Sequence, residues 1–329
     1  MCRLREADGL GRTGFWLGRP QVHLSVLTLN LALNKYAFHW SYPEILADEQ
    51  GIYAKNEVEV RWRDATPREV VNKTVMYTDL LKERETDVYH AGEWACINRV
   101  AKSPGTWIIA KSPPGEGTLN SNSALYVRSD STVRSPADLE GKPVAIEDGS
   151  GPQYAIINDL EGLIPRDEIK LKQVGEPHKR LLALLEGQVE AASLVGPWSD
   201  IGKAMGLRMV LQSARQNPTT SVVRRDADPE LLRRYFRATN RAIDLIGETP
   251  ETFRKSYMWR VEAILEEMSL GVPEETLRNA VVVPRWNRWE RYTEEDFATT
   301  YEWMSQRGLA PRGLVPGDKV ASYELDAFS

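Results

Sequence analysis

Short apolar runs alternate with amphipathic stretches over the first two-thirds of the chain. Runs with strand character span residues 22–31, 58–64, 86–90 and 107–110. Residues 43–54, closed by Gly51, and residues 93–102 have helical spacing. A further helix is predicted from Thr66, which can cap it, with Pro67 in the first turn and Glu69 completing a capping box. Alternating strands and helices favour an α/β architecture with mostly parallel sheets.

A second block of the same kind follows the Gly-, Pro- and Ser-rich stretch KSPPGEGTLNSNS. Its strands are expected at residues 124–131, 142–147, 169–174, 189–195 and 206–213. Ser135-Pro136 starts a short helix, and a glycine loop leads into a helix over residues 153–160. TTSVVRRDADPELLRRYF then passes from a strand to a helix capped by Asp228, and the rest is mainly helical.

Two short α/β blocks with paired connections predict two lobes joined by two crossover segments. We expect residues 1–21 to form a loose tail, residues 22–118 plus 216–329 to form lobe I, and residues 119–215 to form lobe II. The C-terminal helices would return to cover lobe I. Ligands of open parallel sheets bind outside the carboxyl ends of the strands.

One corner pattern occurs twice, once in each predicted lobe. Gly92-Glu93-Trp94 and Gly196-Pro197-Trp198 each follow a helix, a turn and a short buried strand. Because both corners lie at carboxyl ends of strands, we expect Trp94 and Trp198 to face each other across a cleft.

Composition narrows the class of protein. The chain has 329 residues, a formal net charge of −5 and no apolar run of membrane-spanning length, so neither nucleic acid binding nor membrane insertion is expected. Cys2 and Cys96 give no disulfide framework and no metal-ligand spacing. The first 20 residues lack the apolar core of a signal peptide. We therefore expect a cytoplasmic protein as the sequence is written, or a periplasmic or extracellular one if the start site differs.

Several segments in consistent order resemble one bacterial family. They are ILADEQGIYAKNEVEV, LKERETDVYHAG, YVRSDSTVRSPADLEGKPVAI, GLIPRDEIKLKQVGEPHKRLLALLEGQVEAASLVGPWSD, SVVRRDADPELLRRYFRATNRAI and TTYEWMSQRGL. Over residues 22–310 the chain resembles the solute-binding proteins for aliphatic sulfonates, nitrate and pyrimidine precursors. The resemblance implies a two-lobed type II periplasmic-binding-protein fold that closes on a small anion.

The same family includes cytoplasmic desulfinases and decarboxylases. The desulfinase resemblance would require a cysteine in the loop after the first strand, but that loop reads ALNKYAFHWSYPE. The cysteine-rich motif of the pyrimidine synthase is also absent. Neither cysteine mechanism is therefore carried over.

The resemblance assigns the loop after the first strand to the ligand site. Its candidates are Asn34, Lys35, Tyr36, His39 and Trp40. Lys35 or His39 could neutralise a carboxylate or sulfonate, and His39 could also move protons near neutral pH. The structural alternative is a surface lysine among packed aromatic residues.

The first Gly-x-Trp corner supplies a second group of candidates. Gly92 lets the backbone approach a ligand, Trp94 offers a flat wall, and His90 with Glu93 could form an acid/base pair. No helix-spaced motif such as H-E-x-x-H supports a metal, so no metal and no cofactor are predicted. The alternatives are a strand-end histidine bonded to backbone and a hydrophobic plug.

The third group lies in the second lobe. Gly149, Ser150, Gly151 and Gln153 open a helix whose N-terminus would receive an anion, although a tight turn explains the same glycines. Pro197, Trp198 and Thr220 complete the predicted binding set.

Two functions remain open at this point. The first is binding of a small organic anion (a sulfonate, a carboxylate or a pyrimidine-like heterocycle) in the interdomain cleft, with a membrane permease of an ABC transporter as partner. The alternative is a cytoplasmic, cofactor-independent lyase with His39, His90 and Lys35 as catalytic residues.

Overall fold

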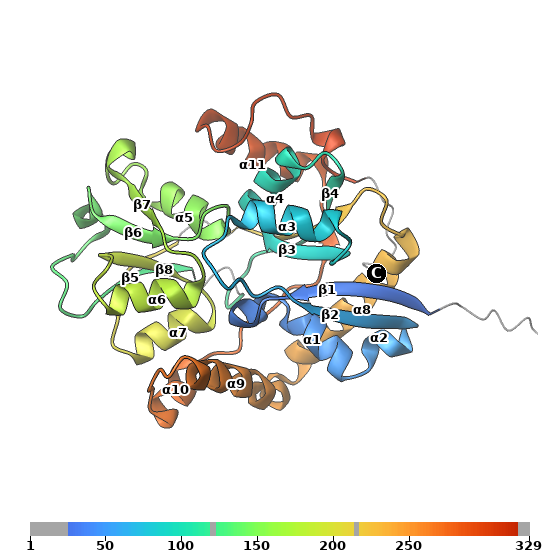
Figure 1. The fold of residues 1–329 in the computed structure, drawn as a ribbon, viewed down its shortest axis with the longest axis horizontal. Coiled ribbons are helices and arrows are strands. Elements are labelled where there is room, and N and C mark those ends of the chain that lie inside the picture. Colours follow the sequence, from blue (N-terminus) through green and yellow to red (C-terminus); the bar gives the residue numbers. More distant parts are fainter. Residues whose placement is uncertain (1–25, 119–122, 214–216, 322–329) are drawn as a thin grey trace, which may run out of the picture.

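The computed structural model describes residues 26–118, 123–213 and 217–321, which form two lobes side by side (Figure 1). The tail predicted for residues 1–21 lies outside the described residues. Lobe I contains a six-stranded sheet in the order β11-β4-β10-β3-β1-β2. Its strands are β1 (Leu27–Leu33), β2 (Val58–Asp64), β3 (Val88–Gly92), β4 (Thr106–Ser112), β10 (Thr219–Arg224) and β11 (Glu290–Arg291).

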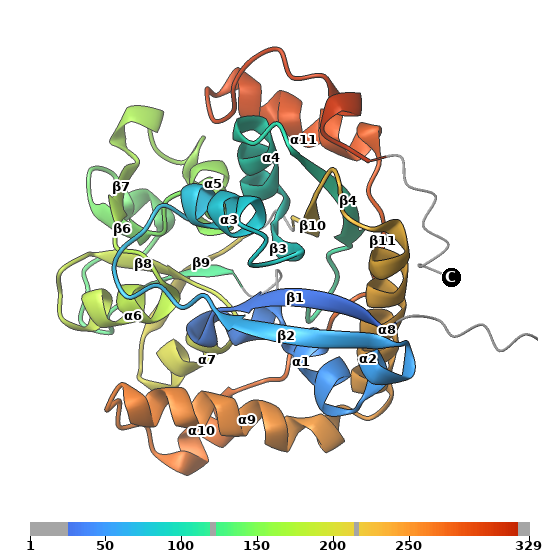
Figure 2. The same ribbon diagram turned by 45° about the vertical axis from the view of Figure 1, so that its right-hand side comes forward.

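Helices cover both faces of this sheet (Figure 2). One face packs against α1 (Tyr42–Glu49), α2 (Ile52–Lys55) and α8 (Pro229–Glu248). The other packs against α3 (Lys73–Lys82) and α4 (Glu93–Lys102), with α11 (Glu294–Gln306) outside α4. Because successive strand side chains point to opposite faces, Val88 joins the core of the first face and Tyr89 that of the second.

Lobe II contains a five-stranded sheet in the order β7-β6-β8-β5-β9. Its strands are β5 (Ala124–Val127), β6 (Pro143–Ile146), β7 (Lys170–Gln173), β8 (Ala191–Leu194) and β9 (Arg208–Gln212). Helix α5 (Gly151–Leu160) packs on one face, and α6 (Pro177–Leu185) with α7 (Pro197–Ala204) on the other. Short 3₁₀ helices occur at Lys35–Trp40, Pro136–Leu139, Arg166–Glu168 and Pro316–Asp318.

Two connections join the lobes, one between β4 and β5 and one between β9 and β10. Strands β4 and β10 pair antiparallel, with Ser112 opposite Thr219. Strands β5 and β9 also pair antiparallel, with Ala124 opposite Gln212. The outgoing and returning segments therefore leave lobe I together and enter lobe II together, which is the arrangement of a two-segment hinge.

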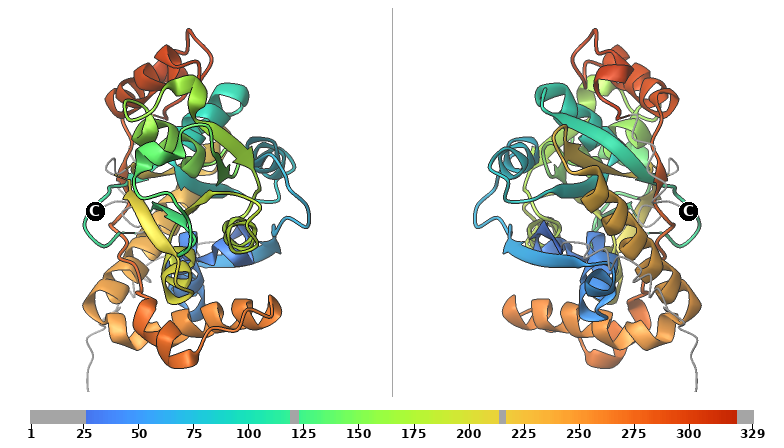
Figure 3. Two further views of the ribbon diagram at one scale, coloured as in Figure 1. Left: turned by 90° about the vertical axis from the view of Figure 1, so that its left-hand side faces the viewer. Right: turned by 90° about the vertical axis from the view of Figure 1, so that its right-hand side faces the viewer.

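The C-terminal helices do more than cover lobe I. Helix α9 (Pro250–Glu267) packs on α8, but α10 (Glu274–Ala280) packs on α7 of lobe II, where Val282 N donates to Asp200 (3.2 Å). Figure 3 shows α9 and α10 at one end of the molecule and α11 at the other. The sequence-based lobe boundaries remain a prediction.

Two predicted helices need correction. No helix begins at Thr66: residues 65–72 form an irregular segment, and α3 starts after Asn72, whose Oδ1 accepts from Thr74 N at 2.9 Å. The helix expected over residues 43–54 is split by Gly51, which has a φ of 63° and ends the regular hydrogen bonding between α1 and α2. The first boundary is set by the Asn72 cap, and the second is set by Gly51, which breaks the helix.

Candidate functional site

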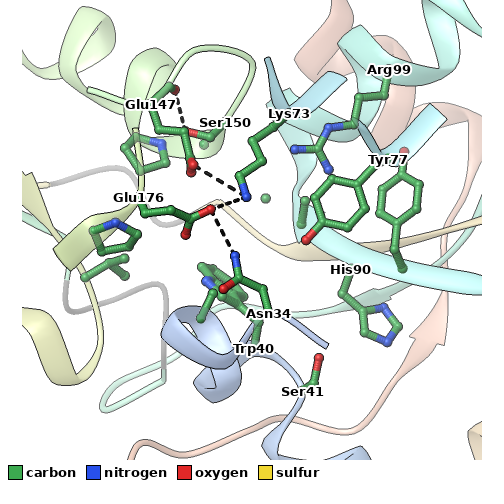
Figure 4. Close-up of a pocket in the computed structure, with 18 of the residues that line it drawn as sticks. Asn34, Trp40, Ser41, Lys73, Tyr77, His90, Arg99, Glu147, Ser150 and Glu176 are labelled. Atoms are coloured by element: carbon green, nitrogen blue, oxygen red, sulfur yellow. Dashed lines mark hydrogen bonds and ion pairs between the residues drawn. The ribbon is translucent and has the colours of Figure 1, made fainter. Parts of the chain in front are cut away.

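A pocket with a cavity volume of about 130 Å³ lies between the lobes (Figure 4). Lobe I contributes the ends of β1 and β3, the starts of α1 and α4, and α3. Lobe II contributes the loop before α5 and the start of α6. The volume suits one small molecule, since cavities of about 150 Å³ hold benzene.

Two helix N-termini meet at this pocket. Helix α4 begins after Gly92 and α5 begins after Ser150. The backbones approach so closely that a Cβ on Gly92 would lie 3.7 Å from the Cα of Gly151. The first N–H groups of a helix have no acceptor within the helix and carry partial positive charge, so this part of the pocket favours an anion, although Glu93 N donates to Pro218 O.

A buried ion cluster bridges the lobes beside these helix ends. Lys73 Nζ of lobe I pairs with Glu176 and lies 3.6 Å from Glu147, both of lobe II. Asn34 Nδ2 also donates to Glu176, at 2.9 Å. Figure 4 shows these side chains converging from opposite sides.

The cluster shifts the pKa of each of its carboxyl groups. Burial, reinforced by the charge of Glu176, raises the pKa of Glu147 to about 6 against the attraction of Lys73. Burial would also raise the pKa of Glu176, but Lys73 and the bonds from Lys73 and Asn34 hold it below its ordinary value. Glu176 is thus the firm ionic partner of Lys73.

Arg99 is the pocket cation with the most unpaired donors among the described residues. It projects from α4, is 2% exposed, and donates from Nη2 to Gly149 O of lobe II at 3.1 Å. Its Nε and Nη1 have no hydrogen-bond partner among the described residues. The guanidinium lies over the rings of Tyr77 and Tyr89, at 4.6 and 5.3 Å from their centroids. A planar cation held this way can offer two N–H groups to a ligand.

Arg180 of α6 also lines the pocket, and only its Nη2 has no hydrogen-bond partner among the described residues. Its Nε and Nη1 donate to Ser193 O and Gly175 O, both at 2.7 Å, and burial lowers the pKa of its guanidinium. It adds positive charge near Glu147 and Glu176.

The predicted acid/base pair of His90 and Glu93 is wrong. Glu93 turns away from the pocket and accepts hydrogen bonds from Tyr292 and Thr300, both at 2.7 Å. His90 lies in the pocket wall and instead contacts Glu44, with 2.9 Å between Nε2 and Oε1. Glu93 is the first residue of α4 and His90 lies three positions before it in β3, so the two side chains point to different sides of the sheet edge.

The structure divides the sixteen predicted binding residues into two groups. Those that line the pocket are Asn34, Trp40, His90, Gly92, Trp94, Ser150 and Gly151. Those outside its lining are Lys35, Tyr36, His39, Glu93, Gly149, Gln153, Pro197, Trp198 and Thr220.

Lys35 and His39 leave the pocket for opposite reasons. Lys35 projects to the surface, where it pairs with Glu267. His39 is fully buried in the core, and desolvation lowers its pKa to about 3, so it stays neutral at physiological pH. Neither is placed to neutralise a bound anion.

The expectation that Trp198 faces Trp94 across the cleft is also wrong. Trp198 is 1% exposed and its indole Nε1 donates to Tyr36 O of lobe I at 2.7 Å. The ring of Tyr36 in turn stacks on His178 of lobe II, with centroids 3.8 Å apart. This second corner therefore packs the lobes together and leaves no face for a ligand.

The remaining residues outside the pocket serve local structure. Gln153 Oε1 accepts from Gly149 N at 3.0 Å, so these two residues hold the turn before α5. Pro197 is buried at the start of α7, and Thr220 is fully buried in β10. Ser150 does line the pocket, but its hydroxyl donates to Glu147 O at 2.6 Å.

Sequence reasoning missed the charged residues of the pocket. They are Glu44, Lys73, Arg99, Glu147, Glu176 and Arg180. Glu147 directly follows β6, and Glu176 lies in the loop between β7 and α6, so the rule about carboxyl ends of strands could have found them. Lys73, Arg99 and Arg180 lie within helices, where a single charge is ordinarily assigned to solvent, and no local signal identifies them.

The described residues contain no group of three or more His, Cys, Asp or Glu side chains arranged to hold a metal ion. None of the helices described combines the length and the apolar character needed to cross a membrane.

Comparison with known proteins gives one family match. The family described as ABC transporter, phosphonate, periplasmic substrate-binding protein matches residues 68–260, more than half of the chain. No curated protein sequence matches the chain.

Solved structures share the whole architecture at low sequence identity. The alkanesulfonate-binding protein SsuA from Xanthomonas axonopodis pv. citri, bound to MOPS, has a TM-score of 0.70 and 15% identity, covering 91% of this chain and 99% of its own. SsuA from Escherichia coli has a TM-score of 0.66 and 14% identity, covering 90% and 92%. The desulfurization enzyme DszB has a TM-score of 0.54 and 16% identity, covering 92% and 97%. The two-lobed fold and the family resemblance predicted from the sequence are therefore confirmed.

Proposed function

Because the chain belongs to the periplasmic substrate-binding proteins of phosphonate-type ABC transporters, we propose that it binds a small organic anion between its lobes and delivers it to a membrane permease. The ligand class comprises compounds with a sulfonate, phosphonate or carboxylate group. The cavity of about 130 Å³ limits the ligand to one small molecule.

The observation that carries the proposal is the state of Arg99. Its side chain is almost fully buried in the pocket wall, yet Nε and Nη1 have no partner in the described part of the chain. Leaving buried charged donors unsatisfied is costly, and an oxyanion would satisfy both at once. The N-termini of α4 and α5 support the same class of ligand. So does the structural similarity to the SsuA proteins.

A lyase remains the second candidate function. It is favoured by the likeness to DszB and by the contact between His90 and Glu44, since a carboxylate can orient a histidine for proton transfer. Lys35 and His39, the other predicted catalytic residues, are outside the pocket. We therefore favour binding over catalysis.

Titration calorimetry with alkanesulfonates, alkylphosphonates, carboxylates and MOPS tests the proposal. At least one class should bind, and Arg99→Met should weaken that ligand about tenfold or more, the usual effect of losing a hydrogen bond to a charged group. Arg99→Lys keeps the charge but not the planar pair of donors, so its affinity for the ligand should lie between those of the original protein and Arg99→Met.

Arg234→Met is the matched control. Arg234 is also a buried helical arginine, with a 7% exposed side chain, but it pairs with Glu57 and Glu230 away from the pocket. It should lower stability without changing affinity. Equal losses of affinity in both variants, or no binding by any anion, would refute the proposal.

Localisation follows the family in part. The family whose model matches is described as periplasmic, and we propose that this protein acts in the periplasm too. Fractionation of cells expressing the chromosomal gene with a C-terminal tag should recover it with periplasmic markers. Recovery with cytoplasmic enzymes alone would favour the lyase alternative.

A further inference from the structure

Glu147 lines the same pocket as the proposed anion site. It directly follows β6, and its carboxyl group points toward Lys73 of α3 in Figure 4, with 3.6 Å between Oε1 and Nζ. The same Nζ donates a hydrogen bond to Glu176, which also accepts from Asn34. Glu147 is therefore the more weakly paired of the two carboxylates in the ion cluster.

Charged and titratable groups from several elements surround Glu147. They are Lys73 and Tyr77 of α3, Arg99 of α4, Glu176 in the loop before α6, and Arg180 of α6. Burial, and after it the charge of Glu176, disfavours the ionised form of Glu147, whereas the three cations favour it. The adjacent Asp148 is exposed to a different partner, since it accepts from Asn72 at 2.7 Å. The charge of Glu147 therefore depends on how strongly the cations of the pocket attract it.

An anion at Arg99 competes with Glu147 for one of these cations. Arg99 Nε and Nη1 have no hydrogen-bond partner among the described residues, and its charge also acts on Glu147. An oxyanion bonded to Arg99 would offset that attraction and would add a like charge to the pocket that Glu147 lines. Both changes make the ionised carboxylate less favourable.

The balance of charge in the pocket leads to the same result. When all are ionised, the cations of the described lining (Lys73, Arg99 and Arg180) equal its carboxylates (Glu44, Glu147 and Glu176) in number. A bound monoanion leaves one negative charge in excess, which one added proton removes. Glu176 is the poorer site for that proton because, against its burial, Lys73 and Asn34 hold its pKa below the ordinary value. Burial raises the pKa of Glu147 to about 6, so this carboxyl accepts a proton more readily.

We propose that Glu147 takes up a proton from the solvent when an anion binds at Arg99, so that capture of the anion is coupled to pH. The protonated carboxyl no longer competes for Arg99, and its O–H becomes a hydrogen-bond donor in the pocket. By linkage, affinity is highest at mildly acidic pH and falls as the pH rises above the value at which free Glu147 titrates. This inference rests on the proposed anion-binding function and adds its regulation.

Titration calorimetry in two buffers with different ionisation enthalpies counts the protons taken up. The probes are ethanesulfonate, ethylphosphonate and propionate. With the probe that binds, the original protein at pH 7 should take up about 0.4–0.8 proton per anion through Glu147, because a like charge nearby raises the pKa of a carboxyl group. Its dissociation constant should rise about fivefold or more between pH 5 and pH 8 for the same reason.

Glu147→Gln mimics the protonated carboxyl at every pH. It should bind the same probe about as tightly as the original protein at pH 5 and about fivefold or more tightly than the original protein at pH 8. Its proton uptake should be smaller by the share of Glu147. Protons taken up by the probe itself or by His90 occur in both proteins and cancel in the difference. Retained binding also shows that this variant is folded.

Asp200→Asn is the matched control. Asp200 is another buried carboxyl of lobe II, and burial raises its pKa, but it lies outside the pocket lining and accepts from Val282 N. This variant should keep the full proton uptake of the original protein. Equal uptake by the original protein and Glu147→Gln, an equal loss of uptake in Asp200→Asn, or failure of Glu147→Gln alone to bind would overturn this inference while the anion site stands. Failure of the original protein to bind any of these anions overturns both.

Discussion

The two Gly-x-Trp corners share a sequence pattern and a position at the end of a buried strand, yet they do different work. At the first, Gly92 and Trp94 line the pocket between the lobes. Trp94 and Trp198 are both buried, but Trp198 lies outside the pocket lining and bonds to Tyr36 of the other lobe. The same three-residue pattern therefore forms a binding wall in lobe I and an interlobe contact in lobe II.

The difference comes from what lies opposite each corner. The first faces the glycine loop before α5, where the missing side chains of Gly92 and Gly151 let the two backbones approach each other at the pocket. The second faces the 3₁₀ helix at Lys35–Trp40, whose Tyr36 and a neighbouring His178 fill the space. Tertiary neighbours, more than the local pattern, decide which corner is open.

The largest expected effect is at Trp198. Trp198→Ala should lower the free energy of unfolding by about 3–5 kcal/mol, because it empties a buried site and removes the bond to Tyr36 O. Urea unfolding followed by circular dichroism measures it. Trp198→Phe should recover most of the loss. If ligand affinity fell far more than stability, the comparison of the two corners would be mistaken.

A similar loss is expected at the ion cluster opposite the first corner. Lys73→Met leaves Glu147 and Glu176 buried without their shared cation, which should cost about 3–5 kcal/mol. Adding Glu176→Gln should restore part of the stability. A double variant no more stable than Lys73→Met alone would show that the three groups are not coupled.

The glycines of the two corners give a matched pair. Gly196 has φ 57° and ψ −137°, a region that L-residues avoid, so Gly196→Ala should cost about 1–3 kcal/mol. Gly92 has ordinary dihedral angles, and a Cβ there meets only Gly151 Cα at van der Waals distance. Gly92→Ala should change stability by less than about 1 kcal/mol but weaken ligand binding. The reverse order of the two stabilities would contradict the assigned roles.

Glu147 should make stability depend on pH. Its folded pKa of about 6 exceeds the ordinary value of 4.5, so the folded state holds the proton more tightly. The stability that this proton provides is present below about pH 4.5 and is lost as pH rises through 6. As the pH rises from 4.5 to 7, the free energy of unfolding of Glu147→Gln should therefore increase by about 1–2 kcal/mol relative to that of the original protein.

Comparing the two unfolding profiles isolates this effect. Changes caused by His39 and His178 occur in both proteins and cancel in the difference. Parallel profiles across this range would show that Glu147 does not titrate there.

Much of the fold could be predicted from the sequence because its signals are local. The apolar run at residues 58–64 and the helix over residues 93–102 have the bounds predicted for them. Caps at Asp228 and Thr293 also accept the backbone hydrogen bonds expected of them. The helix predicted at Thr66 does not form there, because Asn72 caps a helix that begins further along the chain. The start of that helix contacts lobe II, where Lys73 N donates to Asp148 O.

The site was less predictable because its charged residues gain their meaning from the other lobe. In the sequence, Arg99 is an ordinary helical arginine. Only the folded structure brings it against Gly149 O and two tyrosine rings. Glu176 becomes a buried ion only where Lys73, 103 residues earlier, reaches it. Aromatic and glycine patterns marked the region of the pocket, but no local period could mark these pairs.

The smallest effect is expected at Lys35, which sequence reasoning placed in the site. Lys35 and Glu267 have side chains 43% and 49% exposed, and solvent screening leaves such an exposed ion pair with little effect on stability. Lys35→Ala should therefore lower stability by less than about 1 kcal/mol and leave ligand affinity unchanged, in contrast to Arg99→Met. Calorimetry at low and high salt distinguishes the effects of the two substitutions on ligand affinity. A distant surface charge affects affinity only through long-range electrostatics, which salt screens. A tenfold loss of affinity at high salt in Lys35→Ala would move the anion site from Arg99 to the loop after β1.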